Sequence, residues 1–409
     1  MSFVPKTFHR TRHTWLLYLA YAVFGYIVNC LGPVTPFLKA ELALSYTVSS
    51  LHFSAYAIGM IMASLIGYIV VGRLGRRGGL WLGMIGMGAS GLVLIAASMA
   101  WLTISASFVM GVMGCLMLAV IPAGLSDEHG DNRSIALSES TLVASISSAV
   151  APLMIGWFSY SLLGWRFALV IPLLAALVLF LVMGKTAFMG VSLPAKSGAP
   201  QTSAGQPAQT STKLPRRYWI FWLGIFFSVA IEYCMLSWCA DYLEKVVGLP
   251  KAEAAQALTV FLAGIIIGRV IGSRLLLRFT SYQVVTGSLL LCAAGFVLYW
   301  SAGAAGLVIA GLFITGVGVA CQFPLNLSLA LGASGGNTVQ ASAGATLASG
   351  IAILVLPLVL GRLADSVGIR TAYGVVLALA VASFVLIRLS ARRIVPRPSR
   401  FDVGSNIAE

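Results

Sequence analysis

The sequence predicts an all-α membrane protein with twelve transmembrane helices in two pseudo-symmetric six-helix bundles. Three observations predict this fold. Only 9% of the 409 residues are charged and 59% are hydrophobic, whereas a soluble domain carries about 25% charged residues. Apolar runs long enough to cross a hydrocarbon core of about 30 Å as helices alternate with short polar joints. The second half of the chain repeats the first.

The repeat consists of matches at a constant separation of 205 residues. The segment Pro152-Leu-Met-Ile-Gly156 returns as Pro357-Leu-Val-Leu-Gly361, and Arg73 corresponds to Arg278. A single match carries little weight in a chain with 43 glycines. A constant offset over several segments indicates an internal duplication.

The predicted spans fall into two groups of six on either side of a polar segment. The first group covers residues 15–38, 49–71, 78–98, 101–122, 133–158 and 165–185. The second covers residues 218–240, 254–275, 281–300, 303–327, 338–360 and 370–390. The intervening residues are rich in Pro, Ser, Gly and Thr and cannot bury enough apolar surface to fold. We therefore expect an N-terminal bundle at 1–189, a flexible cytoplasmic linker at 190–217, and a C-terminal bundle with a basic tail at 218–409.

The net charge of +14 is distributed as membrane topology requires. With the N-terminus in the cytoplasm, 19 of the 26 Lys and Arg residues lie on inner segments, six on outer segments, and Arg269 inside a span. This asymmetry follows the positive-inside rule and predicts that both termini are cytoplasmic. It also argues against a nucleic-acid partner. We expect a monomer embedded in a lipid bilayer, with its first span retained and not cleaved as a signal.

Motifs of enzymes and metal proteins are missing from the sequence. The six cysteines lie within predicted spans and have no metal-site spacing, so we expect neither a disulfide nor a metal site. There is no GxxxxGK[ST] phosphate loop for an ATP-driven cycle, and no nucleophile elbow. These absences predict a protein that is not an enzyme and has no cofactor.

A short glycine- and arginine-rich joint carries a family resemblance. Gly72-Arg-Leu-Gly-Arg-Arg77 lies between the second and third spans. It resembles the end of the signature loop of the major facilitator superfamily, whose positions are filled here by Gly72, Arg73, Gly75, Arg76 and Arg77. Gly164-Trp-Arg166 and Gly361-Arg-Leu-Ala-Asp365 resemble other recurring joints of that family. The acid that usually precedes the first arginine of the loop is Gly72 here, so a lock through that acid must use other residues.

The resemblance covers the whole chain and implies a bacterial inner-membrane transporter that works by alternating access. In that family, spans one, four, seven and ten line a central cavity, and spans five and eight run along the seam between the halves. The implied function is secondary active transport of a small organic solute, coupled to protons. An uncoupled facilitator or uniporter is the alternative, and a non-transporting sensor or assembly factor is a third possibility.

Charged residues inside the spans are functional candidates because an unpaired charge in lipid is costly. Glu232 falls near the middle of the seventh span. A carboxyl at that depth can take up a proton from one side and release it on the other, and we predict that Glu232 couples transport to the proton gradient. The alternative is a neutral, structural Glu232 that is satisfied by a neighbouring backbone group or hydroxyl.

Glu139 and Arg269 lie at matching depths in the fifth and eighth spans. Each is six residues from the predicted inner end of its span, which corresponds to about 9 Å at 1.5 Å per residue. We predict that they form an ion pair that closes the inner side in the outward-open state and separates in the inward-open state. The alternatives are that both face a wet vestibule unpaired, that Arg269 binds an anionic substrate, or that Glu139 binds a proton or cation.

Other polar, aromatic and sulfur-bearing side chains at cavity depth are candidates for solute contact. These are Asn29 and Tyr26 in span one, Met113 in span four, Tyr233 and Trp238 in span seven, and Gln322 and Asn326 in span ten. Span four has methionines but no charged residue, Asn or Gln, which favours an amphipathic or drug-like solute over a sugar. Core packing explains the aromatic residues and the methionines equally well.

Overall fold

The computed structural model describes residues 8–186, 214–335 and 337–391, except for the side chains of residues 68, 338, 339 and 389–391. Within these residues the secondary structure is helical, with no strand. Most of the predicted linker and the end of the basic tail lie outside the described residues.

The N-terminal half begins with a span that is broken into two helices. The helices of this half are α1 (Arg12–Val28), α2 (Leu31–Glu41), α3 (Tyr46–Ala96), α4 (Ala100–His129), the short turn η1 (Gly130–Asn132), α5 (Arg133–Ser159) and α6 (Phe167–Met183).

The C-terminal half follows the same plan, again with a broken span. Its helices are α7 (Arg216–Tyr242), the short turn η2 (Leu243–Val247), α8 (Lys251–Leu275), α9 (Ser281–Ser301), α10 (Ala305–Val319), α11 (Gln322–Gly332), α12 (Thr338–Val367), α13 (Ile369–Ala372) and α14 (Gly374–Ala391).

The helices confirm the predicted all-α membrane fold. Among the described residues, 10 stretches are long and apolar enough to cross a membrane. One of these stretches, Ala100–Ser159, contains both α4 and α5, and α6 is a shorter apolar helix of 17 residues. Helices dominate because a backbone in lipid must satisfy its own hydrogen bonds.

Helix α3 contains two predicted spans that reverse direction at Gly75. This residue has φ 71° and ψ 166°, a backbone conformation that glycine adopts without steric cost. The arms before and after it both pack on α4, because Gly59 lies against Phe108 and Gly83 lies against Met117. The glycine of the signature-like joint therefore forms the turn between two antiparallel spans.

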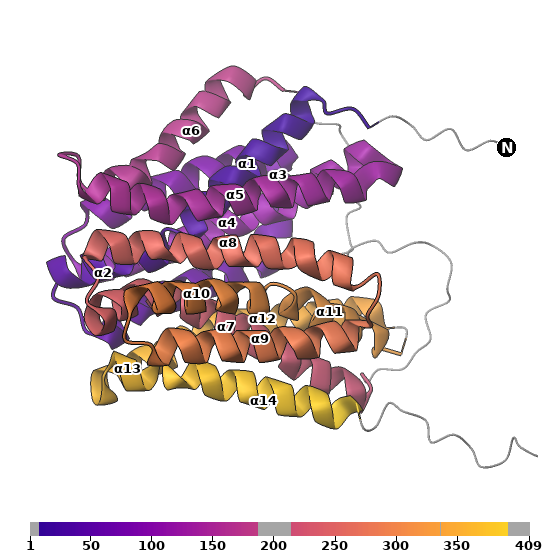
Figure 1. Cartoon of the computed structure of the whole chain (residues 1–409). Coiled ribbons are helices and arrows are strands. Elements are labelled where there is room, and N and C mark those ends of the chain that lie inside the picture. Colours follow the sequence, from indigo (N-terminus) through magenta and orange to yellow (C-terminus); the bar gives the residue numbers. More distant parts are fainter. Residues whose placement is uncertain (1–7, 187–213, 336, 392–409) are drawn as a thin grey trace, which may run out of the picture.

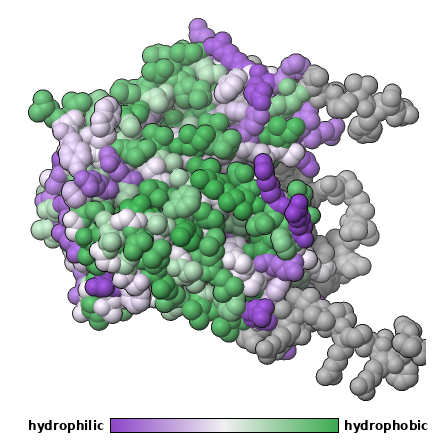
Figure 2. Space-filling view, viewed as in Figure 1, coloured by the Kyte–Doolittle hydropathy of each residue, from purple (hydrophilic) through white to green (hydrophobic). Residues whose placement is uncertain are grey.

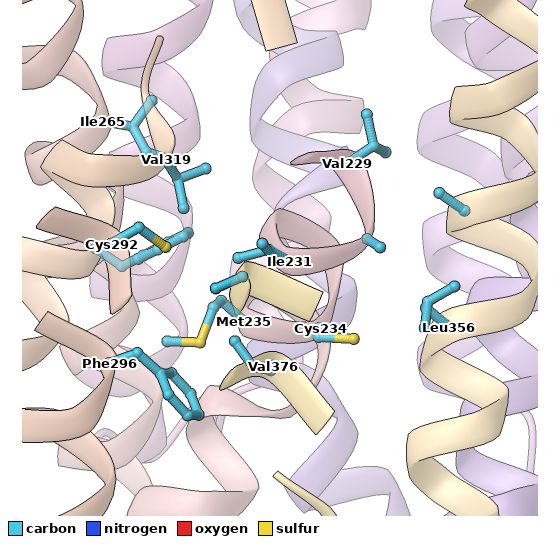
Figure 3. Packing of buried hydrophobic residues seen from close by; sticks show 14 of the residues in the cluster. Val229, Ile231, Cys234, Met235, Ile265, Cys292, Phe296, Val319, Leu356 and Val376 are labelled. Atoms are coloured by element: carbon cyan, nitrogen blue, oxygen red, sulfur yellow. The ribbon is translucent and has the colours of Figure 1, made fainter. Parts of the chain in front are cut away.

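Each half has its own hydrophobic core. One cluster of buried residues takes its members from residues 16–183 and the other from residues 218–387, with only Ala255 and Ala57 crossing over. Figure 3 shows part of the C-terminal core, where Met235 of α7 lies near Phe296 of α9 and Val376 of α14. Two separate cores leave a seam between the halves.

The molecule has two polar ends and an apolar belt. We call the end where α1 and α7 begin the terminal face, and the opposite end, where α2 ends and α8 begins, the far face (right and left in Figure 1). Hydrophobic side chains cover much of the surface between these faces, and hydrophilic side chains gather toward the ends (Figure 2). Exposed residues such as Leu65, Val178 and Leu290 belong to this belt, as expected for lipid-facing helices.

Candidate functional site

A buried ion pair joins the two halves at the far face. Lys39 near the end of α2 pairs with Asp241 near the end of α7. The side chain of Asp241 is fully buried and that of Lys39 is 11% exposed. The ammonium group also lies 3.6 Å from the ring centre of Tyr46. A pair withdrawn from water in this way holds only while both partners are present.

Asp365 near the end of α12 caps the start of α3 across the seam. Its carboxylate accepts hydrogen bonds of 2.8 Å from the backbone N–H groups of both Tyr46 and Thr47, and one of 2.5 Å from the Thr47 hydroxyl. A carboxylate at a helix N-terminus satisfies free N–H groups and interacts favourably with the helix dipole. This cap therefore ties the C-terminal half to the N-terminal half at the far face.

Backbones and aromatic rings complete the far-face contact. Gly32 of α2 lies directly against the carbonyl of Leu236 in α7, so that a Cβ atom there would overlap the carbonyl oxygen. Trp238 is fully buried and packs against Tyr46 and Phe53 of α3. The far face of the seam is closed.

Toward the terminal face, the seam contains two adjoining cavities. The inner cavity has a volume of about 150 Å³ and is lined by residues of α5, α7 and α8 and by the end of α1. The outer one, of about 510 Å³, lies between the terminal-face portions of α5 and α8, which run side by side in Figure 1. The two cavities share Ser145, Ile266 and Arg269 as lining residues.

The inner cavity contains one acidic and one basic side chain, both from helices of the C-terminal half. Glu232 of α7 lines this cavity. Its carboxyl group forms no hydrogen bond or ion pair with the described residues. Arg269 of α8 lines the cavity as well and interacts electrostatically with Glu232. Its guanidinium donates a long hydrogen bond of 3.4 Å to the Ser145 hydroxyl of α5. Arg269 thus bridges the seam without neutralising Glu232 by direct contact.

The Major Facilitator Superfamily sequence profile matches residues 17–332 and 221–406. The chain belongs to the major facilitator superfamily.

Relatives and solved structures agree with this membership. An uncharacterized transporter of the superfamily from Yersinia pestis is 23% identical over 367 residues, which cover 88% of this chain and 90% of the relative. A glucose/galactose transporter of Brucella abortus is 30% identical over 162 residues, 37% of each chain. A crystal structure of a nucleoside transporter covers 94% of this chain and 100% of its own with a TM-score of 0.75 at 14% identity. An inward-facing bacterial homologue of the human lysosomal transporter Spinster covers 94% and 98% with a TM-score of 0.69 at 15% identity.

Four of the side chains singled out in the sequence meet in the inner cavity of this major facilitator protein. Glu232, Arg269, Asn29 and Tyr233 all line it. The sequence reasoning placed them at suitable depths, and the structure shows that they also share a rotation toward the seam. Ser145 and Ser148 of α5 line the same cavity and were missed. Serine is common in this chain, and only their spacing of three residues, which puts them on one helix face, could have singled them out.

Two aromatic candidates do not line this cavity in the described conformation, although the sequence predicted that they would. The Tyr26 hydroxyl donates a 3.0 Å hydrogen bond to the carbonyl of Ala168 inside the N-terminal half. Trp238 belongs to the far-face contact, where its indole donates a 3.2 Å hydrogen bond to the carbonyl of Pro357. Each ring carries a polar group that finds a backbone partner away from the cavity.

Three further candidates are also directed elsewhere. Met113 packs against Gly86 of α3, which is core packing within the N-terminal half. Asn326 of α11 donates a 3.0 Å hydrogen bond to the Ser228 hydroxyl of α7 and joins two helices of the C-terminal half. Gln322 bonds the carbonyl of Gly318, one turn earlier. The methionine argument for a drug-like solute therefore loses its basis, because the described cavity has no methionine among its lining residues.

Glu139 does not meet Arg269 in this structure. Its carboxylate accepts hydrogen bonds of 2.8 and 2.5 Å from Arg10 and one of 3.1 Å from the Tyr18 hydroxyl. The hydrogen bonds to Glu139 raise the pKa of Arg10, which precedes the first span. Depth along the helix identified residues at the same level of the membrane, but Arg10, a basic residue of the same half, lies nearer to Glu139 than Arg269 does. The pair with Arg269 was predicted for an outward-open state and stays a prediction for that state.

The signature-like joint ties helices of the N-terminal half together at the terminal face. Arg76 forms a 2.5 Å ion pair with Asp127 at the end of α4. Arg77 donates a hydrogen bond to the carbonyl of Gly184 after α6. Gly72 and Arg73 are exposed. The sequence predicted that any lock between the halves uses residues other than the missing acid. The inter-half polar contacts described above, through Lys39 and Asp365, lie at the opposite face.

Proposed function

We propose that this protein is a secondary active transporter that moves a small organic solute by alternating access and is coupled to protons through Glu232. The observation that carries the proposal is the position of Glu232. It lines a cavity at the seam between two separately packed halves, and that cavity lies on the terminal side of a closed far face. A charged residue within a span is tolerated where it faces such a cavity, and it marks a solute or proton pathway.

The proposed orientation places the terminal face in the cytoplasm of a bacterium. The excess of Lys and Arg on the predicted inner segments supports it. In this orientation the described conformation is inward-facing, because the halves touch at the periplasmic end and leave cavities toward the cytoplasm. A monomer is sufficient for the mechanism, since the seam lies within one chain.

The solute is proposed to be small and organic. The names of relatives and structural neighbours support this class, since they include a glucose/galactose transporter, a nucleoside transporter and a peptide transporter. The competing function is an uncoupled facilitator in which Glu232 is structural. That function requires no titrating group in the cavity.

The Glu232→Gln variant separates these two functions. A transported solute is first identified as a ligand that raises the melting temperature of the purified protein. In proteoliposomes with an imposed pH gradient, we expect the variant to lose concentrative uptake by at least roughly 10-fold, since the glutamine amide cannot carry a proton. Solute exchange without a gradient, measured at a saturating solute concentration, should persist because the cavity keeps its shape.

Glu253→Gln at the exposed start of α8 is the matched control and should behave as the unmodified protein. Concentrative uptake by Glu232→Gln with an unchanged response to the pH gradient would show that Glu232 does not couple protons.

A further inference from the structure

We propose that the inner cavity binds a small zwitterion, with its protonated amine toward Glu232 and its carboxylate toward Arg269. This inference rests on the proposed function, in that the cavity is taken as the transport site, and it adds the chemical class of the solute. It follows from the charges, the hydrogen-bonding groups and the size of the cavity.

The two charges of the cavity call for a ligand with two opposite charges. Glu232 and Arg269 both line the cavity, yet the described structure assigns no ion pair between them. The Glu232 carboxylate, which is partly buried, is costly to ionise until an opposite charge or hydrogen bonds compensate it, whereas the exposed Arg269 can exchange its water for a carboxylate. A neutral sugar would bring a direct counter-charge to neither side chain, and a simple acid or amine would bring one to only one of them. A zwitterion compensates both at once.

The polar groups around Glu232 present mainly oxygen lone pairs. The Ser148 hydroxyl donates its proton to the carbonyl of Gly25 at 3.0 Å, and the Ser145 hydroxyl donates to the carbonyl of Thr141 at 2.8 Å. The amide nitrogen of Asn29 donates to the carbonyl of Gly25 at 3.1 Å. With their single protons used inside the protein, the two serine hydroxyls are left as acceptors, and the Asn29 amide offers its oxygen as an acceptor beside one remaining N–H. A protonated amine, with three N–H donors, matches a wall of acceptors next to a carboxylate.

Arg269 supplies the opposite chemistry at the junction of the two cavities. Its guanidinium has five N–H donors, and its assigned hydrogen bond is the long one to Ser145. Its side chain is exposed and lines both the inner cavity and the larger opening toward the terminal face. The planar fork of arginine fits a carboxylate in a bidentate geometry. A carboxylate entering from the terminal face would therefore meet Arg269 first.

The remaining walls and the volume limit the size of the solute. The other lining side chains are Tyr233 and five apolar residues, which are Val28, Leu236, Leu262, Ile265 and Ile266. The volume of about 150 Å³ is below the roughly 300–1,000 Å³ of pockets for drug-sized ligands. A short carbon chain between the two charged groups fits both the apolar walls and this volume.

The test measures binding by isothermal titration calorimetry on the full-length protein in detergent. The probes are glycine, β-alanine and γ-aminobutanoate, each compared with the matched acid that lacks the amine and the matched amine that lacks the carboxylate, and with glucose. We expect at least one zwitterion to bind roughly 10-fold more tightly, or better, than its matched acid and its matched amine. Each matched compound lacks one charged group, and the loss of that group's hydrogen bonds weakens binding by about this factor or more.

Variants assign the binding to the two charged side chains. Glu232→Gln and Arg269→Gln should each weaken zwitterion binding by roughly 10- to 100-fold. Arg269→Lys keeps the charge and should retain part of the affinity. Arg274→Gln, at an exposed position five residues further along α8, is the matched control and should leave binding unchanged.

Several results overturn the inference. They are equal binding of an acid, an amine or glucose, no binding by any of the zwitterions, or variants that bind the zwitterion as the unmodified protein does. Binding and transport fail separately. A zwitterion that binds but shows no uptake driven by a pH gradient contradicts the proposed function alone, whereas uptake of glucose driven by a pH gradient, without zwitterion binding, contradicts this inference alone.

Discussion

Replacing Lys39 by Met is expected to destabilise the closed far face by about 3 to 5 kcal/mol, because it leaves the fully buried carboxylate of Asp241 without its counter-charge. The protein should respond by opening the far face, which returns Asp241 to water. The expected result is a lower melting temperature of the purified protein and a faster reaction of a maleimide with a cysteine introduced at Leu236, which lies in the far-face contact.

The double variant Lys39→Met with Asp241→Leu makes this prediction sharper. Replacement of a buried ion pair by apolar residues is often neutral or stabilising, so the double variant should recover most of the lost melting temperature. Arg166→Met is the control, since Arg166 pairs with Glu41 at the same face but is 46% exposed, and exposed pairs contribute about 1 kcal/mol or less. If Lys39→Met melts and labels as the unmodified protein does, the pair does not hold the far face closed.

Replacing Gly32 by Ala is expected to stop transport while the protein still folds. The added Cβ would overlap the backbone carbonyl of Leu236 across the seam, and a backbone cannot move aside as a side chain can. The far face should then fail to close, and without closure the cavity cannot be offered to one side at a time. Folding should survive because each half has its own core.

The measurement for Gly32→Ala is solute uptake into proteoliposomes, which we expect to fall by at least about 10-fold, in line with the rate loss that a displacement of about 1 Å causes at a tuned site. Gly287→Ala in α9 is the matched control, because a Cβ there meets no atom within 4 Å. Alanine also has a higher helix propensity than glycine, so the control substitution should not weaken α9. Normal uptake by Gly32→Ala would mean that α2 and α7 need not approach this closely in the transport cycle.

The sequence was sufficient to predict the class of fold, and the reason is the solvent. In lipid, long apolar runs have few choices beyond a helix, so length and composition were enough to place the spans. The separation of 205 residues between Arg73 and Arg278 indicated the duplication. The cost of a charge in lipid marked Glu232 and Arg269 as candidates, and the family resemblance placed their spans at the cavity and the seam.

Rotation about the helix axis could not be predicted from depth alone. Tyr26 and Asn29 are separated by less than one turn, yet the hydroxyl of Tyr26 turns into the N-terminal half and the amide of Asn29 lies at the cavity. Asn326 lies at a suitable depth but bonds Ser228 within its own half. Such choices depend on which neighbouring helix offers a free hydrogen-bond partner, and a single sequence does not contain that information.

The partners of the charged residues could not be predicted from depth either. Glu139 was matched with Arg269 by depth, but Arg10, two residues before α1, reaches it first. Lys39 and Asp241 lie at the ends of their spans, where the sequence offers no reason to expect burial. Their pairing becomes apparent only when α2 and α7 are seen to touch.

The central claim is that the two halves rock about a shared cavity that is open to one face at a time. Its most direct test is the distance between pairs of spin labels, measured by pulsed electron paramagnetic resonance in a background without native cysteines. One pair, at Ala43 and Glu253, reports on the far face, and the other, at Ser138 and Ser273, reports on the terminal face; all four positions are exposed. When the pH or a bound solute is changed, the account predicts that one distance lengthens as the other shortens. Two distances that lengthen together, or that stay fixed in a preparation that transports, would contradict it.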